Sequence, residues 1–547
     1  MFKTVKIVFI FLMLFSTSVE AQTYYWIGFT DKANFQYTIL NPTEYLSERA
    51  IERRQNQGIP IDEFDLPVND NYINEVLNLG ATYIHSSKWL NGITVKADSA
   101  DFEEKASLLS FVNDIQVTKR NLITTKSLKS KWEFNSSDND LVIDSTYYGA
   151  SVYQVGQLNG QYLHNKNFRG QGKHIAVLDG GYYKTNEYTA FDSLWANGQI
   201  LGTKDFVNPD SDIFQESYHG MSVLSTMGGN IPGLLIGTAP KASFWLIRSE
   251  DTPTEFLIEE DNWVAAAEYA DSVGADIINS SLGYYLFDDT TTNHNYADMD
   301  GNTTRVTQAA NIAASKGMVV VASAGNEGND QWKYILAPSD GDDVIAVAAV
   351  DRLGDPAYFT SYGPASDGGI KPNVAAIGQN TVLQKSNGLI STGNGTSFSG
   401  PVIAGMAACL WQANPEANAQ QIKEAIEKSA HLYNSPDSLL GYGIPDFMVA
   451  DQILKLSRIN SLYINNGWTV FPNPFSNKVV LFQDGEIIFG EIEIEVIDIS
   501  GRVLTNRIVE SNSIMVLNGL SDLPSGIIFL KIKSEEGLQG IKLIKID

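Results

Sequence analysis

Ser397 stands just before a long uncharged run of the chain, from Pro401 to Leu410. A run without charge predicts a helix that is buried on all sides, and Pro401 suits the first turn of a helix, where a missing N–H costs nothing. The free N–H groups at the amino end of a helix favour negative charge, such as the oxyanion that forms when a serine attacks a carbonyl. Ser397 is therefore a candidate nucleophile.

A serine is a weak nucleophile without a base and a group that orients the base. The apolar run 175–178 predicts a buried strand that ends in Asp179 and two glycines, which places a carboxylate at the carboxyl end of a strand. His219 lies just before the uncharged segment 221–227, at the start of a predicted helix. We therefore expect Asp179 to orient His219 and His219 to act as the base.

A third predicted strand leads into an asparagine. The run 319–322 is apolar and continues into Asn326, which glycines flank, and the amide of Asn326 could donate a hydrogen bond to an oxyanion. Each residue also has a simpler interpretation, with Ser397 or Asp179 as a helix cap and His219 as a core histidine. Four such motifs, each at the end of a predicted strand or the start of a predicted helix, together favour catalysis.

These four motifs resemble those of the subtilisin-like serine proteases. Asp179, His219 and Ser397 follow the chain order known for subtilisin. The resemblance implies a secreted serine endopeptidase that hydrolyses protein or peptide substrates through an Asp-His-Ser triad and an acyl-enzyme intermediate. It implies an oxyanion-binding role for Asn326.

The same resemblance implies where a substrate binds. One wall of the cleft would pair with the substrate backbone, and the opposite wall would close the specificity pocket. The loop after Asn326 is shorter than is usual in the family, which leaves the preferred substrate side chain open. The implied substrate-binding residues are Ser281, Leu282 and Gly283 on the first wall and Ser323, Ala324 and Gly325 on the second.

Two other classes of protein could contain such a serine motif. An α/β-hydrolase esterase needs a Gly-x-Ser-x-Gly elbow and the order Ser, acid, His. The stretch around Ser397 has Ser399 in place of the second glycine, and the order along the chain differs. A non-catalytic surface adhesion or binding protein on the same scaffold would be expected to lack one or more of the four site residues, and all four are present. The adhesion protein stays as the alternative.

Runs typical of strands and helices alternate through the region that holds these motifs. Such alternation predicts an α/β fold with a parallel sheet flanked by helices. The resemblance implies that this sheet is subtilisin-like, and we expect the peptidase domain to span residues 150–457. The runs are 244–247, 263–270, 276–279, 306–314, 318–322 and 344–350.

The amino-terminal residues predict export. Lys3, Lys6, the apolar run 7–15 and a small-residue cleavage site before Gln22 predict a signal peptide over residues 1–21. The apolar run is shorter than the roughly 20 residues that span a bilayer, so no transmembrane anchor is expected in the mature protein. We expect a secreted or cell-surface location.

Residues 22–126 differ in composition and predict a small α+β unit. The segment 24–29 predicts a strand and 42–57 a charged helix, whose polar residues 48–54 we interpret as solvent-exposed surface. Its position before the protease resembles that of a subtilisin-type propeptide, which implies that it inhibits the enzyme as its own partner. A polar linker, 127–149, follows and is the expected region of cleavage.

Residues 462–547 predict a C-terminal β-sandwich, because apolar residues alternate at Ile492, Ile494 and Val496. The segments 470–475, 496–502 and 525–526 resemble the sorting domain of type IX secretion substrates, a Bacteroidetes module. The resemblance implies that the type IX secretion machinery is a partner and carries the chain across the outer membrane. The alternative is a carbohydrate-binding or spacer sandwich, for which Trp468 is the one obvious aromatic that could stack on a sugar.

Charge and cysteine content limit the remaining partners. A net charge of −26 argues against nucleic-acid binding through phosphates. The single cysteine excludes an intrachain disulfide. No cofactor is expected for catalysis. A structural calcium ion is an open alternative, since carboxylates gather at Asp340, Asp342 and Asp343 without a diagnostic ligand spacing, so the metal ligands are unknown.

Overall fold

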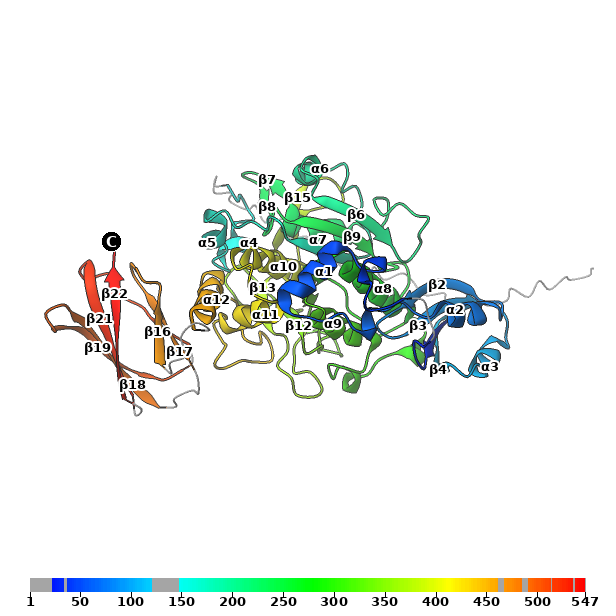
Figure 1. The fold of residues 1–547 in the computed structure, drawn as a ribbon. Helices are drawn as coiled ribbons and strands as arrows, with labels where there is room; N and C mark the ends of the chain where they lie inside the picture. Colours follow the sequence, from blue (N-terminus) through cyan, green and yellow to red (C-terminus); the bar gives the residue numbers. More distant parts are fainter. Residues whose placement is uncertain are drawn as a thin grey trace, which may run out of the picture.

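A computed structural model of the chain contains three units in sequence order (Figure 1). It describes residues 22–33, 37–120, 147–460, 467–484, 490–512, 514–534 and 537–546. The expected signal peptide and most of the expected linker lie outside the described residues. The four-stranded sheet of the first unit and the C-terminal sandwich lie at opposite ends of the middle unit. Within the described part of the chain, no helix is long and apolar enough to cross a membrane.

A seven-stranded parallel sheet forms the centre of the middle unit, which confirms the predicted fold class. Every residue of β10, β11, β12 and β13 is buried, as expected for parallel strands that helices cover on both faces. The strand order is β13-β12-β11-β10-β5-β9-β6. The bounds are β5 His174–Asp179, β6 Ile200–Asp205, β9 Ser243–Arg248, β10 Ile277–Ser280, β11 Val319–Ser323, β12 Val344–Val350 and β13 Val374–Ile377.

Helices cover both faces of this sheet. Ile175 and Val177 of β5 point into a core shared with α7, α10, α11 and α12, whereas Ala176 and Leu178 point into a second core shared with α8 and α9. The alternation follows from the two-residue period of a strand. The helices are α7 His219–Gly228, α8 Ile258–Ser272, α9 Arg305–Ser315, α10 Thr396–Ala413, α11 Ala419–Lys428 and α12 Phe447–Asn460.

Shorter elements complete the middle unit and lie mostly at its surface. The hairpin of β14 and β15 packs beside α7. These elements are α4 Val152–Gly156, α5 Gln161–Asn165, η3 Thr189–Phe191, α6 Asp192–Ala196, β7 Asn230–Ile231, β8 Leu235–Ile236, η4 Thr290–Thr292, η5 Tyr296–Asp298, β14 Thr381–Gln384 and β15 Ile390–Gly393.

The amino-terminal unit is an antiparallel sheet of order β2-β3-β1-β4 with helices packed against it. It has its own apolar core, which includes Ile27, Ile93 and Phe102. The predicted α+β class is confirmed. The elements are β1 Thr23–Phe29, η1 Pro42–Glu44, α1 Glu48–Gln57, η2 Glu63–Asp65, α2 Asp70–Leu77, β2 Thr82–Ser87, β3 Gly92–Ala97, α3 Phe102–Ser107 and β4 Val112–Arg120.

Two expectations about the segment 42–57 were wrong. It is not one helix, because Ser47 accepts a hydrogen bond from Ala50 N at 3.2 Å and so caps a separate helix, α1. The polar residues of α1 are also not simply solvent-exposed. Arg53 and Arg54 are buried, and both form ion pairs with Asp271 of α8. The charged face of α1 is therefore an interface with the middle unit.

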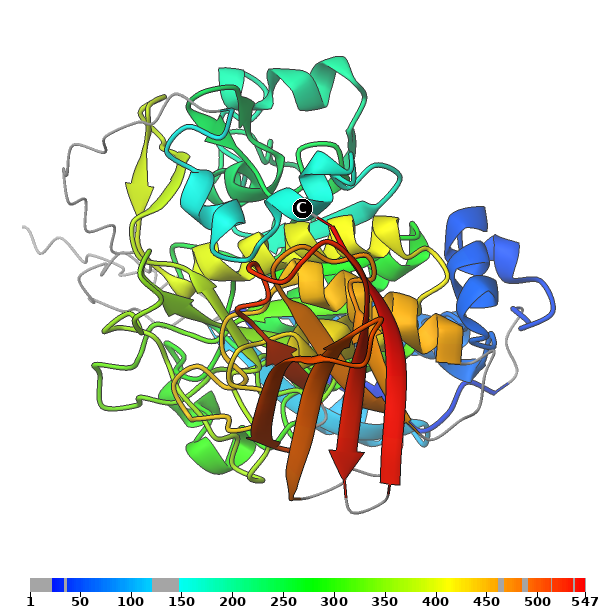
Figure 2. The same ribbon diagram turned by 90° about the vertical axis from the view of Figure 1, so that its left-hand side faces the viewer.

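The C-terminal unit is a sandwich of two antiparallel sheets, with strand orders β16-β17-β20 and β19-β18-β21-β22. Figure 2 shows its strands in front of the middle unit. Ile492, Ile494 and Val496 point inward, which confirms the predicted alternation. The strands are β16 Gly467–Phe471, β17 Val479–Asp484, β18 Glu491–Asp498, β19 Val503–Glu510, β20 Ile514–Leu517, β21 Gly526–Ser534 and β22 Gly537–Lys545.

Two side chains of the sandwich bear on its role. Trp468 is 5 % exposed and belongs to the core of the sandwich. It therefore offers no ring face for a sugar, contrary to the expectation for a carbohydrate-binding module. Ile514 is half-buried and packs against the apolar core of the middle unit, so the two units are in contact.

Candidate active site

The four predicted residues come together at one edge of the parallel sheet. Asp179 ends β5, His219 begins α7, Ser397 is the second residue of α10, and Asn326 lies just beyond the end of β11. His219, Asn326 and Ser397 line a single cleft of about 370 Å³. Asp179 lies below the cleft and is fully buried.

Asp179 and His219 form a buried pair. The Nδ1 atom of His219 lies 2.9 Å and 3.0 Å from the two carboxylate oxygens of Asp179. Asp179 Oδ1 also accepts a hydrogen bond from Gly180 N at 2.7 Å. Because a carboxylate can only accept, Nδ1 carries the proton of the neutral imidazole and Nε2 is left with a lone pair. This tautomer is the one that a general base requires.

Gly220 allows the close approach of α7 to β5. A Cβ atom at this position would lie 2.8 Å from the Cβ atom of Asp179 and 2.5 Å from the carbonyl oxygen of Gly181. Either contact is too short for a side chain to fit without movement of the backbone. A residue larger than glycine would push His219 away from Asp179.

Ser397 sits in the first turn of α10, after Gly395, whose φ of +146° is a conformation that side chains disfavour. Its hydroxyl donates to the carbonyl oxygen of Ser281 at 3.4 Å. The helix that follows is buried almost throughout, as its uncharged sequence predicts. The N–H groups of a first helical turn carry partial positive charge. Here Thr396 N donates to Asn326 and Phe398 N donates to Gly395 O, and Ser397 between them lines the cleft.

The predicted place of Pro401 was wrong. α10 begins at Thr396, so Pro401 lies inside the helix and not in its first turn. A proline has no N–H to donate to the carbonyl four residues earlier, which here is that of Ser397. Ser281 Oγ donates to this carbonyl instead, at 2.9 Å. Ser281 is thereby tied to the backbone of the candidate nucleophile.

Asn326 is oriented by the residue before Ser397. Its Oδ1 atom accepts hydrogen bonds from Thr396 N at 2.8 Å and from Thr396 Oγ1 at 3.1 Å. With the oxygen held in this way, the Nδ2 group is the part of the amide that can donate to a substrate. The geometry suits stabilisation of negative charge near Ser397.

Five of the six predicted substrate-binding residues line the cleft. They come from the two expected walls, whereas Ala324 does not line it and packs in a small apolar cluster with Ile335 and Ala365. Sequence reasoning missed several lining side chains that come from loops without a periodic pattern. The lining residues predicted from the sequence are Ser281, Leu282, Gly283, Ser323 and Gly325, and those missed include Glu250, Glu255, Tyr285, Glu327, Asp330 and Tyr358.

The carboxylates of Asp340, Asp342 and Asp343, beside which a calcium ion is an open alternative, are not among the groups of close acidic side chains. Asp340 is buried and both of its carboxylate oxygens accept hydrogen bonds, from Gly301 N at 3.0 Å and from Thr307 Oγ1 at 2.6 Å. Burial raises the pKa of Asp340 to about 6. A different acidic group, Glu250, Glu255 and Glu259, has carboxylate oxygens within 4.8 Å of one another. Among the described residues, it is the one group whose spacing suits a cation.

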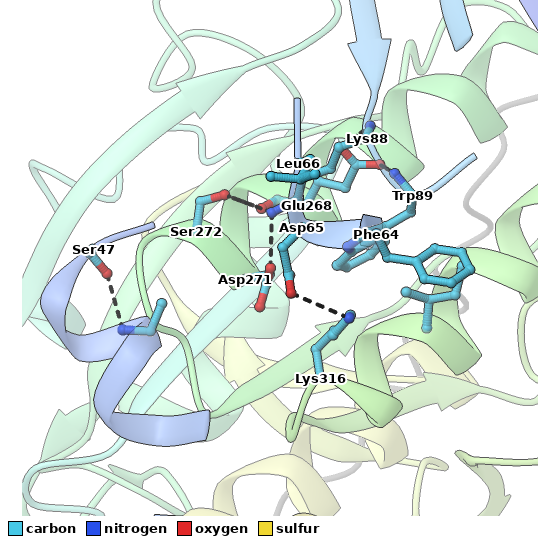
Figure 3. Close-up of polar contacts among 12 residues, drawn as sticks. Ser47, Phe64, Asp65, Leu66, Lys88, Trp89, Glu268, Asp271, Ser272 and Lys316 are labelled. Carbon is cyan, nitrogen blue, oxygen red and sulfur yellow. Dashed lines mark hydrogen bonds and ion pairs between the residues drawn. The ribbon is translucent and has the colours of Figure 1, made fainter. Parts of the chain in front are cut away.

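The amino-terminal unit docks on α8 through buried polar contacts (Figure 3). Glu268 accepts hydrogen bonds from Ser87 Oγ at 2.5 Å, from Lys88 N at 2.9 Å and from Trp89 N at 3.0 Å. Without these hydrogen bonds, burial of the Glu268 carboxylate would cost much free energy.

Asp271 is the centre of an ion cluster at the same interface. It forms ion pairs with Arg53 at 2.5 Å, with Arg54 at 2.8 Å and with Lys88 at 3.0 Å, and its side chain is fully buried. Burial alone would raise the pKa of Asp271, but Lys88, Arg53 and Arg54 together hold that pKa well below its usual range. All three cations belong to the amino-terminal unit, so docking of this unit neutralises Asp271.

Comparison with known protein families gives three matches along the chain. Residues 170–443 match the subtilase family, described as Peptidase S8. Residues 24–135 match the Peptidase S8 propeptide domain of Bacteroidota. Residues 469–546 match a secretion system C-terminal sorting domain.

Individual relatives agree with the first match. The chain is 30 % identical over 303 residues to a thermophilic serine proteinase of Bacillus sp. (strain AK1), covering 55 % of this chain and 67 % of that protein. It is 32 % identical over 267 residues to thermitase of Thermoactinomyces vulgaris, covering 48 % of this chain and 82 % of that protein. A crystal structure of MycP1 without its N-terminal propeptide is similar with a TM-score of 0.44 and 23 % identity, covering 55 % of this chain and 96 % of that one.

Proposed function

Because the chain belongs to the subtilase family and is a serine-type endopeptidase, we propose that Asp179, His219 and Ser397 are its catalytic triad. The observation that carries this assignment is the buried contact of His219 Nδ1 with Asp179 beside the cleft that holds Ser397. The contact fixes the imidazole in the tautomer that can take a proton from a serine hydroxyl.

The reaction begins when Ser397 Oγ attacks the carbonyl carbon of a peptide bond and its proton passes to His219 Nε2. The carbonyl oxygen becomes an oxyanion, which accepts hydrogen bonds from Asn326 Nδ2 and from the backbone N–H of Ser397. His219 then donates its proton to the leaving amine, and the acyl group remains on Ser397. Water attacks this ester, again through His219, and releases the acid.

No cofactor takes part in this sequence, since side chains and backbone groups of the chain fill each role. Asp179 does not itself receive the proton but stabilises the imidazolium that forms. A structural calcium ion, which related proteases often hold, stays a prediction without assigned ligands.

We also propose that the amino-terminal unit is an inhibitor of the enzyme that carries it. The family match identifies it as a propeptide domain, and its buried contacts with α8 supply a surface for tight binding. Cleavage is expected in the linker 127–149, after which the unit would bind the mature enzyme as a separate chain.

The C-terminal sorting domain sends the protein to the cell surface or the medium. We propose that the type IX machinery recognises this domain and that its removal leaves the peptidase active. Among the residues that the structure describes, the sandwich contributes none that line the cleft, which supports a role in delivery and not in hydrolysis.

Substitution of the nucleophile tests the proposal. Ser397→Ala should lower the turnover of casein and of a fluorogenic peptide by about 10⁴ to 10⁶ while the melting temperature stays within a few degrees. Ser399→Ala is the matched control, since Ser399 Oγ only donates to Thr396 O within the same helix, and it should keep activity within about tenfold. Full activity of Ser397→Ala would favour the alternative that the protein is a non-catalytic adhesion protein and that the measured activity comes from a contaminating protease.

A further inference from the structure

The cleft around Ser397 carries several acidic side chains. Glu250, Glu255, Glu327 and Asp330 all line it, and no lysine or arginine is among the described residues that do so. The field inside a cleft lined by one sign of charge attracts the opposite charge more strongly than an open surface does. The bound substrate is therefore expected to bring positive charge.

The carboxylates form two groups that come from separate segments of the chain. Glu327 directly follows Asn326 and, with Asp330, extends the wall formed by Ser323 and Gly325. Glu250 and Glu255 lie in the segment between β9 and α8, and Tyr284 OH donates to Glu250 at 3.1 Å. Glu327 is thus next in sequence to the residue proposed to bind the oxyanion, whereas Glu250 and Glu255 come from a separate segment of the chain.

We propose that this cleft selects peptides with a lysine or arginine at the residue whose carbonyl is attacked, and that Glu327 is the main residue that binds the cation. Glu250 and Glu255 would bind a second basic side chain upstream in the peptide. This inference rests on the proposed function, because it assigns the substrate class of the same site.

The amino-terminal unit supplies an independent observation. Its last strand, β4, ends in Lys119 and Arg120, and both make ion pairs with the middle unit. Lys119 lies 3.4 Å from Asp251, the neighbour of Glu250, and Arg120 lies 3.6 Å from Asp289. The chain that leads from the amino-terminal unit toward its expected cleavage region is thus basic where it meets these two acidic residues.

The position of Asp289 links this contact to the second group. Asp288, the residue before it, accepts a hydrogen bond from Glu255 N at 3.2 Å, and its own N–H donates to Glu255 O at 2.6 Å. Asp251 and Asp289, the partners of Lys119 and Arg120, are therefore adjacent to two of the carboxylates that line the cleft.

The energetics of Glu327 favour a cationic ligand. Burial, followed by the charge and hydrogen bond of Asp330, raises the pKa of Glu327 to about 7. Burial, followed by the charges of Glu327, Asp330 and Glu255, raises the pKa of Tyr285, which also lines the cleft. A lysine ammonium between these groups would offset the repulsion that keeps Glu327 partly protonated.

Two peptides that differ in one side chain test the inference on the mature, active enzyme. One has lysine and the other norleucine at the residue before the scissile bond, so that size is conserved and charge is not. We expect kcat/KM for the lysine peptide to exceed that for the norleucine peptide by at least about tenfold, which corresponds to about 1.4 kcal/mol. The ratio should fall in 1 M salt because ions screen the contact.

Variants locate the residues responsible. Glu327→Gln should lower the ratio by about tenfold, mainly through a loss of kcat/KM for the lysine peptide. Glu187→Gln removes an equal charge from an exposed position outside the cleft and should leave the ratio unchanged. A peptide with a second upstream lysine should lose its advantage in the double variant Glu250→Gln/Glu255→Gln.

The outcomes separate this inference from the proposed function. Equal kcat/KM for the two peptides in the wild type, or a ratio that survives Glu327→Gln in a variant with wild-type melting temperature, would overturn the inference and leave the peptidase assignment intact. Failure to cleave any peptide would contradict the peptidase assignment itself.

Discussion

The ion cluster at Asp271 gives a quantitative prediction for inhibition by the amino-terminal unit. We consider the variant Arg53→Met, which removes the charge of Arg53 and keeps most of its apolar stem. The guanidinium group of Arg53 contacts only the middle unit. It forms an ion pair with Asp271 and donates a hydrogen bond to the carbonyl oxygen of Ala275. The pair of Arg54 with Asp65 inside the unit at 2.7 Å would remain, so the fold of the unit should be preserved.

The expected loss of binding free energy follows from the burial of the Arg53–Asp271 ion pair and from the cations that remain around Asp271. The side chains of Arg53 and Asp271 are 3 % and 0 % exposed, and removal of one partner of a buried pair typically costs about 3–5 kcal/mol. Asp271 keeps Arg54 and Lys88, which places the expected cost near the lower end, at about 3 kcal/mol. A loss of this size would weaken binding by about 150-fold.

The assay is inhibition in trans. Residues 22–120 would be produced as wild type and as Arg53→Met, and the inhibition constant of each would be measured against the mature enzyme. Lys105→Met is the control, because Lys105 forms only an exposed ion pair with Asp101, and it should change the inhibition constant by less than about threefold. Equal inhibition by the wild type and Arg53→Met, with both folded by circular dichroism, would refute the role assigned to the cluster.

Four further predictions concern the oxyanion residue, the pH dependence, the C-terminal unit and the mature amino terminus. Asn326→Leu should lower kcat by about 10² to 10³ with little change in KM, and an effect confined to KM would make Asn326 a binding residue. Because the pKa of Glu327 is about 7, its carboxylate forms as the pH rises from about 6 to about 8, so the ratio of kcat/KM for lysine and norleucine peptides should increase over this range. A chain without residues 462–547 should keep its peptidase activity in a heterologous host, with at most a small loss of stability because the contact of Ile514 is lost. In the native cell the same truncated chain should stay in the periplasm. Amino-terminal sequencing of the secreted full-length protein should give a first residue between 127 and 144 that directly follows a lysine.

The sequence allowed prediction of the catalytic region because its signals are local. Asp179, His219 and Asn326 each lie at the end of an apolar strand or the start of an uncharged helix, and a parallel sheet brings the carboxyl ends of its strands to one edge. The fold and the meeting of these residues therefore followed from hydrophobic runs. The start of α10 did not, because Pro401 is tolerated inside that helix through a hydrogen bond from Ser281, a residue over a hundred positions away.

Other features depend on contacts between distant segments. The polar sequence of α1 gives no sign that Arg53 is buried, since its partner Asp271 is 218 positions away. The acidic lining of the cleft was missed for a related reason, because Glu250 and Glu255 belong to a loop without periodicity. Burial of a charge becomes visible only when the partner that neutralises it is known.

Covalent labelling of the nucleophile tests the central claim most directly. A fluorophosphonate reagent forms a stable bond to a serine only when a neighbouring base activates the hydroxyl. After incubation with the mature enzyme, peptide mass spectrometry should locate one equivalent of label on Ser397, and His219→Ala should prevent the labelling. Label on another serine, or full peptidase activity without label on Ser397, would contradict the account.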